Sequence, residues 1–249
     1  MSAWLEGRVI ENRFWTGTLF SLRVEAPRLA FEAGQFVRLA LDLGEGGARS
    51  RIARPFSFVN PPEDPVMEFY GVIVPEGPLS PHLARLKKGD PLLVADNPSG
   101  FLVLSELPPA EDLWLVATGT GIAPFLSILR SEAPWQRYRR VILVHAARRA
   151  NELVYKEIIL ELQSSRKQFR YISFVSRETH LESLAGRIPG AIRDGRLEAM
   201  TQPISPERSQ FMLCGNPDML KDVAAVLAAR GLRKNRRRTP GQITVESFW

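Results

Sequence analysis

The stretch that most constrains the fold runs from Leu113 to Arg130 and reads LWLVATGTGIAPFLSILR. Its first residues are apolar and predict a buried strand, whereas apolar residues at helical spacing follow from Ile122. Pro124 suits the first turn of a helix, where its missing N–H group costs nothing. A strand, a short glycine loop and a helix N-terminus together present backbone N–H groups to an anion. An ordinary loop between a strand and a helix is the alternative, so a phosphate site here depends on the flanking chain.

After this point, strands and helices alternate along the chain. The predicted strands are Leu113–Ala117, Val141–His145, Tyr171–Val175 and Phe211–Cys214, and the predicted helices are Pro124–Ser131, Leu153–Gln168, Ser183–Asp194 and Met219–Arg230. This alternation indicates an α/β doubly wound parallel sheet with helices on both faces. Ligands of such sheets bind beyond the carboxyl ends of the strands.

The N-terminal part has a different pattern of short strands separated by turn residues. The predicted strands are Gly7–Asn12, Leu19–Ala26, Gln35–Leu41, Arg54–Asn60, Val66–Val74 and Pro91–Ala95, with one short helix at Leu79–Leu86. Short strands with close turns predict an antiparallel β-barrel. The pattern changes at the linker-like segment Ser105–Pro109, which divides the chain into domains 1–104 and 105–249. A cleft between two such domains is a natural cofactor site.

Composition narrows the possible classes of protein. The 249 residues fit one large domain or two ordinary ones. Cys214 is the only cysteine, which excludes an internal disulfide and a four-cysteine iron–sulfur centre. The histidines lack ligand spacing, so we expect no metal site. The apolar runs are too short for a membrane span, and the N-terminus does not resemble a signal peptide, so we expect a cytoplasmic protein with no membrane partner.

The chain is basic, with a net charge of +6 and a basic run at 233–238. Such a balance indicates an acidic partner, which could be an acidic protein, a phosphate-rich cofactor or nucleic acid. A solvated surface whose arginines hold carboxylates is the alternative for most of the basic residues. No aromatic residues interleave with the basic run and no nucleic-acid recognition fold is predicted, so we expect no nucleic-acid partner.

The barrel half contains Arg54-Pro55-Phe56-Ser57 followed by Phe58. Within a few residues it offers a cation, a flat apolar face and a hydroxyl group. A flavin dinucleotide needs all three, for its pyrophosphate, its ring face and its ring edge. The alternative is that Phe56 and Phe58 belong to the barrel core.

Three short sequence motifs occur one after another along the chain. They are Arg54-Pro55-Phe56-Ser57, Gly119-Thr120-Gly121-Ile122-Ala123-Pro124 and Cys214-Gly215-Asn216-Pro217. Together they resemble the signature motifs of the ferredoxin–NADP⁺ reductase family, and the resemblance covers essentially the whole chain. The ending Val245–Trp249 resembles the bacterial ferredoxin/flavodoxin reductases in particular.

This resemblance implies non-covalent FAD in the barrel and NADP(H) in the α/β domain. The residues implied for FAD are Arg54, Pro55, Phe56, Ser57, Tyr70, Val72, Val74, Gly77, Pro78, Leu79, Ser80, Thr120, Phe248 and Trp249. The residues implied for NADP are Ala147, Arg148, Ser176, Arg177, Arg187, Cys214, Gly215 and Asn216. The segment from Gly77 to Ser80 resembles a helix N-terminus aimed at the FAD pyrophosphate, which the bare sequence also permits. The family often has tyrosine where this chain has Phe56, so stacking is kept and a hydroxyl contact is lost.

The implied 2′-phosphate ligands are Arg177 and Arg187, because bidentate guanidinium groups suit that phosphate. Surface salt bridges are the alternative for each of them. Three residues are implied for the reaction itself. Cys214 would position the nicotinamide without nucleophilic chemistry, and a small buried apolar residue is the alternative. Ser57 would lie on the other side of the hydride path. Glu246 is a candidate for handling a proton, and a solvated carboxylate is the alternative. The terminal Trp249 would stack on the adenosine half of FAD, and the alternative is that the pair Phe248 and Trp249 anchors the chain on a hydrophobic patch.

The activity implied is hydride transfer between NADP(H) and FAD, followed by single-electron exchange with ferredoxin or flavodoxin. The basic run would dock an acidic ferredoxin or flavodoxin, and we expect a monomer. Another reductase of the superfamily, acting on free flavin or on an oxygenase, is an alternative, as is a non-catalytic electron-transfer subunit or a basic nucleic-acid-binding module. Firm retention of the flavin would separate the first reading from a free-flavin reductase.

Overall fold

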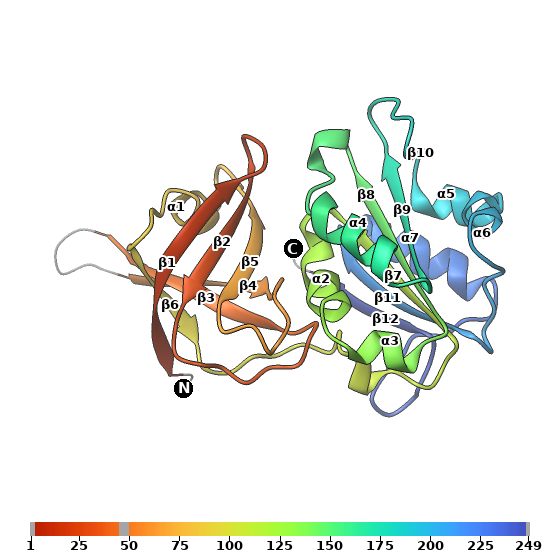
Figure 1. The fold of residues 1–249 in the computed structure, drawn as a ribbon, viewed down its shortest axis with the longest axis horizontal. Helices are drawn as coiled ribbons and strands as arrows, with labels where there is room; N and C mark the ends of the chain where they lie inside the picture. The colour runs from red at the N-terminus through yellow and green to blue at the C-terminus, as the bar shows by residue number, and fades with distance from the viewer. Residues whose placement is uncertain (1–2, 45–49, 248–249) are drawn as a thin grey trace.

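The computed structural model describes residues 3–44 and 50–247. The chain builds one sheet from its N-terminal part and a second from its C-terminal part, and the two lie side by side (Figure 1). A single turn of 3-10 helix, η2 (Leu104–Glu106), lies where the sequence predicts the boundary between domains. Between them the two sheets account for every strand in these ranges.

The N-terminal sheet is antiparallel and curls toward a barrel. Its strands are β1 (Trp4–Phe14), β2 (Leu19–Glu25), β3 (Phe36–Leu43), β4 (Ser50–Ser57), β5 (Met67–Val72) and β6 (Pro91–Ala95), in the spatial order β4-β3-β6-β1-β2-β5. An isolated antiparallel bridge between Phe58, which directly follows β4, and Phe69 of β5 links the two edges of the sheet. Alternate residues along the strands, such as Phe20, Leu22 and Val24, fill the interior.

Two predicted elements of this half differ from the structure. The strand predicted at Arg54–Asn60 is displaced, because β4 begins at Ser50 and its ladder with β3 ends at Ser57. The helix predicted at Leu79–Leu86 is a single turn, α1 (Ser80–Leu83). The first difference follows from turn chemistry, since the Asn60 side chain accepts from the backbone N–H of Glu68 and turns the chain toward β5.

The C-terminal sheet is entirely parallel. Its strands are β7 (Asp112–Thr118), β8 (Arg140–Ala147), β9 (Phe169–Val175), β10 (Leu184–Ala185), β11 (Ser209–Gly215) and β12 (Ile243–Ser247), in the order β10-β9-β8-β7-β11-β12. The helices are α2 (Ala123–Leu129), α3 (Ala133–Arg137), α4 (Lys156–Ser165), α5 (Ile188–Arg193), α6 (Arg196–Ala199) and α7 (Pro217–Ala228). The central strands are buried on both faces, with α2 to α4 over one face and α5 to α7 over the other (Figure 1). The doubly wound fold is therefore confirmed.

Two predicted helices begin later than their sequence pattern indicates. In the stretch predicted as Ser183–Asp194, the chain first pairs as β10 beside β9, and Gly186, with φ of +95°, separates that strand from α5. In the stretch predicted as Leu153–Gln168, Tyr155 has φ of 60°, and α4 begins only after it. The edge strand β12 was not predicted, although Ile243 and Val245 alternate with polar residues as in a half-buried strand.

The order of the strands reverses beside β7. Strand β8 lies on one side of it and β11 on the other, so the carboxyl ends of β7 and β11 flank a topological switch point, where such sheets bind ligands. Helix α2 follows β7 and packs against the barrel, where the Ser127 hydroxyl donates to the backbone oxygen of Asn60 at 2.7 Å. The switch point therefore faces the barrel. No helix within the described ranges has the length and apolar character needed to cross a membrane.

Candidate active site

A cavity of about 240 Å³ lies between the barrel and the start of α2. Its lining residues are Arg54, Pro55, Phe56, Ser57, Tyr70, Gly71, Val72, Val74, Gly77, Pro78, Leu79, Ser80, Thr120 and Ala123. The structure thus brings together the residues that the resemblance implies for FAD, apart from Phe248 and Trp249, which lie outside the described residues. Gly71 and Ala123 also line the cavity and were not among the predicted FAD residues.

The strands explain how these side chains converge. Tyr70 and Val72 are two residues apart on β5 and share one face of that strand. A Cβ atom on Gly71 would lie 3.0 Å from ring carbons of both Phe20 and Phe56. The Phe56 ring therefore packs directly on the backbone of β5. A glycine inside a strand is the signal that could have indicated this close approach.

The loop between β5 and α1 forms one rim of the cavity. The N–H group of Gly77 donates to the carbonyl of Val74 at 2.8 Å, and the N–H group of Val74 donates to the Ser80 hydroxyl at 2.9 Å. These bonds close the loop on itself. Because α1 is only one turn long, an anion here would meet the backbone groups of this loop rather than the dipole of a long helix.

Two polar groups in the cavity lack a partner. Within the described chain, the Ser57 hydroxyl oxygen and the Tyr70 phenol oxygen are buried and make no hydrogen bond. Burial raises the pKa of Tyr70 well above its ordinary value, so its hydroxyl stays neutral and can donate. Buried polar groups are normally paired. A ligand with a polar ring edge would pair both groups, and the flat face of Phe56 and the exposed cation of Arg54 would suit its ring and its phosphates.

The glycine loop after β7 forms the opposite wall. It is a 3-10 turn, η3 (Gly119–Ile122), that leads directly into α2. A Cβ atom on Gly121 would lie 2.5 Å from the carbonyl oxygen of Cys214, and one on Gly215, where φ is +132°, would lie 2.2 Å from the Thr118 hydroxyl oxygen. Only glycine allows the ends of β7 and β11 to approach this closely.

A helix N-terminus lies at the same place. The Asn216 side chain accepts from the N–H groups of Asp218 at 2.9 Å and Met219 at 3.3 Å, and so caps α7. The N–H group of Asn216 donates to the Thr118 hydroxyl at 2.9 Å, which ties this cap to the end of β7. The positive end of a twelve-residue helix is thereby held at the switch point, where it suits an anionic group.

Cys214 and Glu246 are neighbours across β11 and β12. Burial, with the Glu246 charge as a second cause, raises the pKa of the Cys214 thiol well above its ordinary value. Burial also raises the pKa of Glu246 to about 7, although the Phe101 N–H group bonds to this carboxyl. One carboxyl oxygen, Oε1, is buried without a partner among the described residues. The other would lie 3.1 Å from a Cβ atom on Gly100, so the carboxyl faces the end of the barrel chain.

Phe36 and Gly100 connect Ser57 to the neighbourhood of this carboxyl. Ser57 pairs with Phe36 across β3 and β4, and the Phe36 ring lies 3.3 Å from the Cβ position of Gly100, which borders Glu246. The structure thus places Ser57 with Thr120 in the cavity and places Cys214 with Glu246 at the adjoining strand ends.

The predicted phosphate-binding arginines follow neighbouring strands. The N–H group of Arg177 donates to the carbonyl of Arg148 at 2.9 Å, and that of Ser176 donates to the carbonyl of Ala147 at 3.2 Å, so the ends of β8 and β9 are joined. Arg187 follows β10, which pairs with the end of β9.

The three exposed guanidinium groups of Arg148, Arg177 and Arg187 form no ion pair with any residue in the ranges described. The neighbouring Arg149 differs, because it is paired with Glu178 at 3.5 Å. Three exposed cations beside one sheet edge are available to a phosphate.

His145 contacts the backbone of the glycine loop. It is fully buried at the end of β8, and its Nε2 atom lies 3.2 Å from the carbonyl oxygen of Gly119. Burial lowers the pKa of His145 to about 4, so the ring is neutral at physiological pH and can donate to that carbonyl. Within the described residues, no cluster of three or more metal-ligating side chains occurs.

The basic run lies against η2. Arg237 pairs with Glu106 at 3.4 Å and lies 5.6 Å from the ring centroid of Phe101, and the Asn235 side chain donates to the Glu106 carbonyl at 2.8 Å. The remaining basic side chains of the run, Arg233, Lys234, Arg236 and Arg238, are exposed.

Comparisons with known proteins agree with this geometry. A family model described as the oxidoreductase NAD-binding domain matches residues 115–225. The chain is 46% identical over 253 residues to a flavodoxin/ferredoxin–NADP reductase of Escherichia coli (strain K12), with all of both chains covered. It is 36% identical to a ferredoxin–NADP reductase of Pseudomonas aeruginosa, with 96% of this chain and 95% of the relative covered.

A solved structure has the same fold. It is a ferredoxin NADP⁺ reductase from Neisseria gonorrhoeae with bound FAD and NADP, and it superposes with a TM-score of 0.92 at 33% identity over 99% of each chain. Full-length identity, the shared fold and the cavity at the switch point lead to one conclusion. The chain belongs to the flavodoxin/ferredoxin–NADP reductase family.

Proposed function

We propose that this chain is an FAD-dependent oxidoreductase that transfers hydride between NADP(H) and FAD and exchanges single electrons with flavodoxin or ferredoxin. One observation carries the proposal: a cavity with the unpartnered hydroxyl groups of Ser57 and Tyr70 adjoins the switch point of a parallel sheet. The relatives named as flavodoxin/ferredoxin–NADP reductases, and the solved relative with FAD and NADP bound, support the same activity.

Residues of the barrel would hold FAD. The Ser57 and Tyr70 hydroxyls would pair with the polar ring edge, and Phe56 would cover a ring face. Arg54 would neutralise the pyrophosphate. When bound, FAD supplies the chemistry that converts a two-electron hydride transfer into single-electron steps. The protein contributes orientation, exclusion of water and charge.

Residues of the parallel sheet would hold NADP(H). Arg177 and Arg187 would bind the 2′-phosphate, with Arg148 beside them, and the capped N-terminus of α7 would face the pyrophosphate. Gly215 and Asn216 immediately precede this helix, and Gly215 packs against Thr118 at the end of β7. These assignments agree with those that the resemblance implies.

Two side chains near the strand ends would act on the reaction without binding phosphate. Cys214 is a neutral buried thiol and would bound the nicotinamide pocket as a small apolar surface. Glu246, with a pKa of about 7, would take up and release a proton at its carboxyl group near neutral pH.

The acceptor would be an acidic flavodoxin or ferredoxin that docks on exposed cations of the basic run. Electrostatic steering of this kind weakens with salt, so we expect electron transfer to the acceptor to slow at high ionic strength. We also expect a cytoplasmic monomer, for which light scattering after gel filtration would give a mass near 28.0 kDa.

The decisive experiment is to purify the protein, record its absorbance spectrum, and assay NADPH-driven reduction of flavodoxin and ferredoxin separately. We expect a yellow protein that keeps FAD through dialysis and reduces at least one of the two carriers. A protein that binds no FAD after reconstitution and does not oxidise NADPH would overturn the proposal. Reduction of free flavin with easy loss of the bound flavin would favour a flavin reductase instead.

A further inference from the structure

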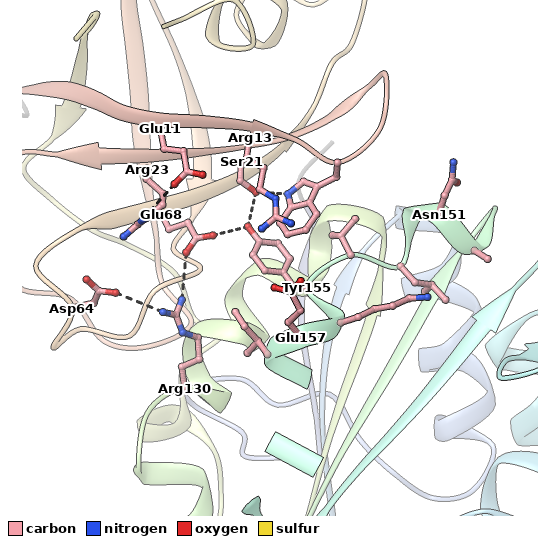
Figure 2. A pocket seen from close by; sticks show the side chains of 16 residues that line it. Glu11, Arg13, Ser21, Arg23, Asp64, Glu68, Arg130, Asn151, Tyr155 and Glu157 are labelled. Carbon is pink, nitrogen blue, oxygen red and sulfur yellow. Dashed lines mark hydrogen bonds and ion pairs between the residues drawn. The ribbon is translucent and has the colours of Figure 1, made fainter. Parts of the chain in front are cut away.

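A second and larger cavity, of about 450 Å³, lies between the barrel and the start of α4 (Figure 2). Polar side chains from the barrel meet side chains from the end of α2 and from the start of α4 along its wall. The Tyr155 hydroxyl lies 2.6 Å from the Ser21 hydroxyl and donates to Glu68 Oε1 at 2.9 Å. The Tyr155 phenol, which belongs to the C-terminal α/β half of the chain (called the nucleotide-binding half below), is thus bonded to both β2 and β5 of the barrel.

The donors and acceptors in this group form a single directed chain. The Trp15 indole N–H group donates to the Ser21 oxygen at 2.7 Å, which leaves the Ser21 proton for the Tyr155 oxygen. The Tyr155 proton then points at the Glu68 carboxylate (Figure 2). Hydrogen bonds that run in one direction strengthen one another in a partly dry environment.

The Glu68 carboxylate has a second partner in the nucleotide-binding half. Its Oε2 atom accepts from Arg130 at 3.4 Å, and Arg130 also pairs with Asp64 at 3.6 Å (Figure 2). Arg130 is the C-cap of α2, the helix that begins at the switch point. The barrel is therefore bonded to the end of α2 and to the start of α4.

The backbone of Tyr155 is held in an unusual conformation. Its φ of 60° makes it the one non-glycine residue with positive φ in the described chain, and a bulky side chain rarely adopts this region. Such a conformation persists only where contacts with the surrounding structure hold it in place. The side chain is only 4% exposed, and its ring packs 4.7 Å from the Trp15 ring and 5.5 Å, edge-on, from the Tyr70 ring.

The contact between Tyr155 and Glu68 adjoins the cavity proposed for FAD, because the Tyr70 side chain touches both Tyr155 and that cavity. Glu68, Tyr70 and Val72 occupy the same face of β5 because alternate residues of a strand share a face. Glu68 bonds to Tyr155, and Tyr70 both contacts Tyr155 and lines the cavity.

We propose that Tyr155 is a positioning residue which, through Ser21 and Glu68, fixes the FAD cavity relative to the nucleotide-binding edge of the parallel sheet and thereby sets the rate of hydride transfer. The inference rests on the proposed function. The two cofactors would be bound by different halves of the chain, so looseness between the halves misplaces the reacting atoms. Misplacement by about 1 Å can slow an enzymatic reaction by about a hundredfold.

The test is Tyr155→Phe in the FAD-loaded enzyme, because phenylalanine keeps the ring and removes only the hydroxyl. We expect kcat for NADPH oxidation with ferricyanide to fall roughly tenfold to a hundredfold, with KM for NADPH changed by less than about twofold. The matched control is Tyr138→Phe, which removes a buried hydroxyl that has no partner in the described chain. The control should keep the kcat of the natural enzyme.

Two further readouts do not depend on turnover. Hydrogen exchange measured by mass spectrometry should speed up in Tyr155→Phe at β2 and β5 and at the start of α4, and stay unchanged in Tyr138→Phe. The FAD absorbance difference produced by saturating NADP⁺ should shrink, because it reports contact between the two rings.

Three outcomes would overturn the inference. They are an unchanged kcat and exchange pattern in Tyr155→Phe, a rise in KM with kcat unchanged, and an equal loss in Tyr138→Phe. Failure of the proposed function is distinguishable, because it would appear in the natural protein as absence of bound FAD and of NADPH oxidation. The exchange comparison between Tyr155→Phe and Tyr138→Phe would still decide whether Tyr155 holds the two halves together.

Discussion

Gly121 packs on the backbone carbonyl of Cys214 so closely that a Cβ atom added to Gly121 would lie 2.5 Å from that oxygen. The two residues are far apart in the sequence. Gly121 follows β7 and Cys214 lies near the end of β11, so both are at the switch point of the parallel sheet. Their contact makes one continuous surface from the ends of β7 and β11. That surface adjoins the cavity that Thr120 and the barrel line together.

Gly121→Ala should damage this surface. The added methyl group would meet backbone atoms that cannot rotate away, so we expect the free energy of unfolding to fall by roughly 1–3 kcal/mol. NADPH oxidation should slow as well. Urea titration and steady-state assays would measure both. Gly17→Ala is the control, because nothing lies within 4 Å of a Cβ atom there, and equal stability of the two variants would contradict the prediction.

Arg177→Ala and Arg187→Ala should each weaken NADPH selectively. Each loses a charge-assisted hydrogen bond to a phosphate, so KM for NADPH should rise roughly tenfold or more while KM for NADH stays nearly constant. Arg149→Ala removes a nearby guanidinium that is already paired with Glu178, and should leave both constants unchanged. An equal loss with NADH would show that these arginines do not read the 2′-phosphate.

Glu246 should make stability depend on pH. Burial raises its pKa from 4.5 to about 7, so between these values the folded carboxyl keeps a proton that the unfolded chain has released. The free energy of unfolding contributed by this group therefore falls as pH rises through that window, by about 3 kcal/mol. Glu246→Gln should flatten the dependence. Urea unfolding at several pH values, with FAD in excess, would test it, and parallel curves for both proteins would refute the prediction.

Cys214 should be unreactive in the folded protein. Its thiol is buried and its pKa is raised well above its ordinary value, so very little thiolate forms at neutral pH. Iodoacetamide at pH 8 should label Cys214 in urea and leave it unlabelled in the native protein, as judged by intact mass. Rapid native labelling would instead indicate an accessible thiolate.

Deletion of Trp249 should loosen FAD. This expectation comes from the sequence, in which a terminal aromatic residue would stack on the adenosine half of the cofactor. The preceding strand β12 ends at Ser247 beside Gly215, near the switch point. Absorbance after extensive dialysis should show less FAD in the truncated protein than in the full chain. Equal retention would contradict the stacking role.

Much of the fold follows from periodicity in the sequence. The buried strand from Leu113 to Ala117 and the glycine loop after it were predictable, because apolar runs and turn residues act locally. Helix α4 was predicted three residues too early, since its apolar spacing continues through Leu153 while the Tyr155 backbone turns to a positive φ. Tertiary contacts of Tyr155, and no local propensity, hold that conformation.

The candidate site, like the fold, was predictable from the sequence only in part. Arg54 to Ser57 and the loop from Gly77 to Ser80 are short segments whose residue types indicate their chemistry, and the structure places both at one cavity. The raised pKa of Glu246 was not predictable. It arises because β12 adds to the sheet edge and buries the carboxyl against Cys214 and Gly100, and a lone carboxylate near a terminus carries no sign of that burial.

The sequence by itself determined the two kinds of sheet, the glycine loop and the residue types available for phosphate and ring binding. Those features depend on backbone preferences and on spacing within a few residues. The tertiary structure alone decided that Tyr155 meets Glu68, 87 positions away, and that Gly121 meets Cys214. Such pairs form only when separate elements pack, because burial and hydrogen bonding reward the final arrangement of the whole chain rather than any one segment of it.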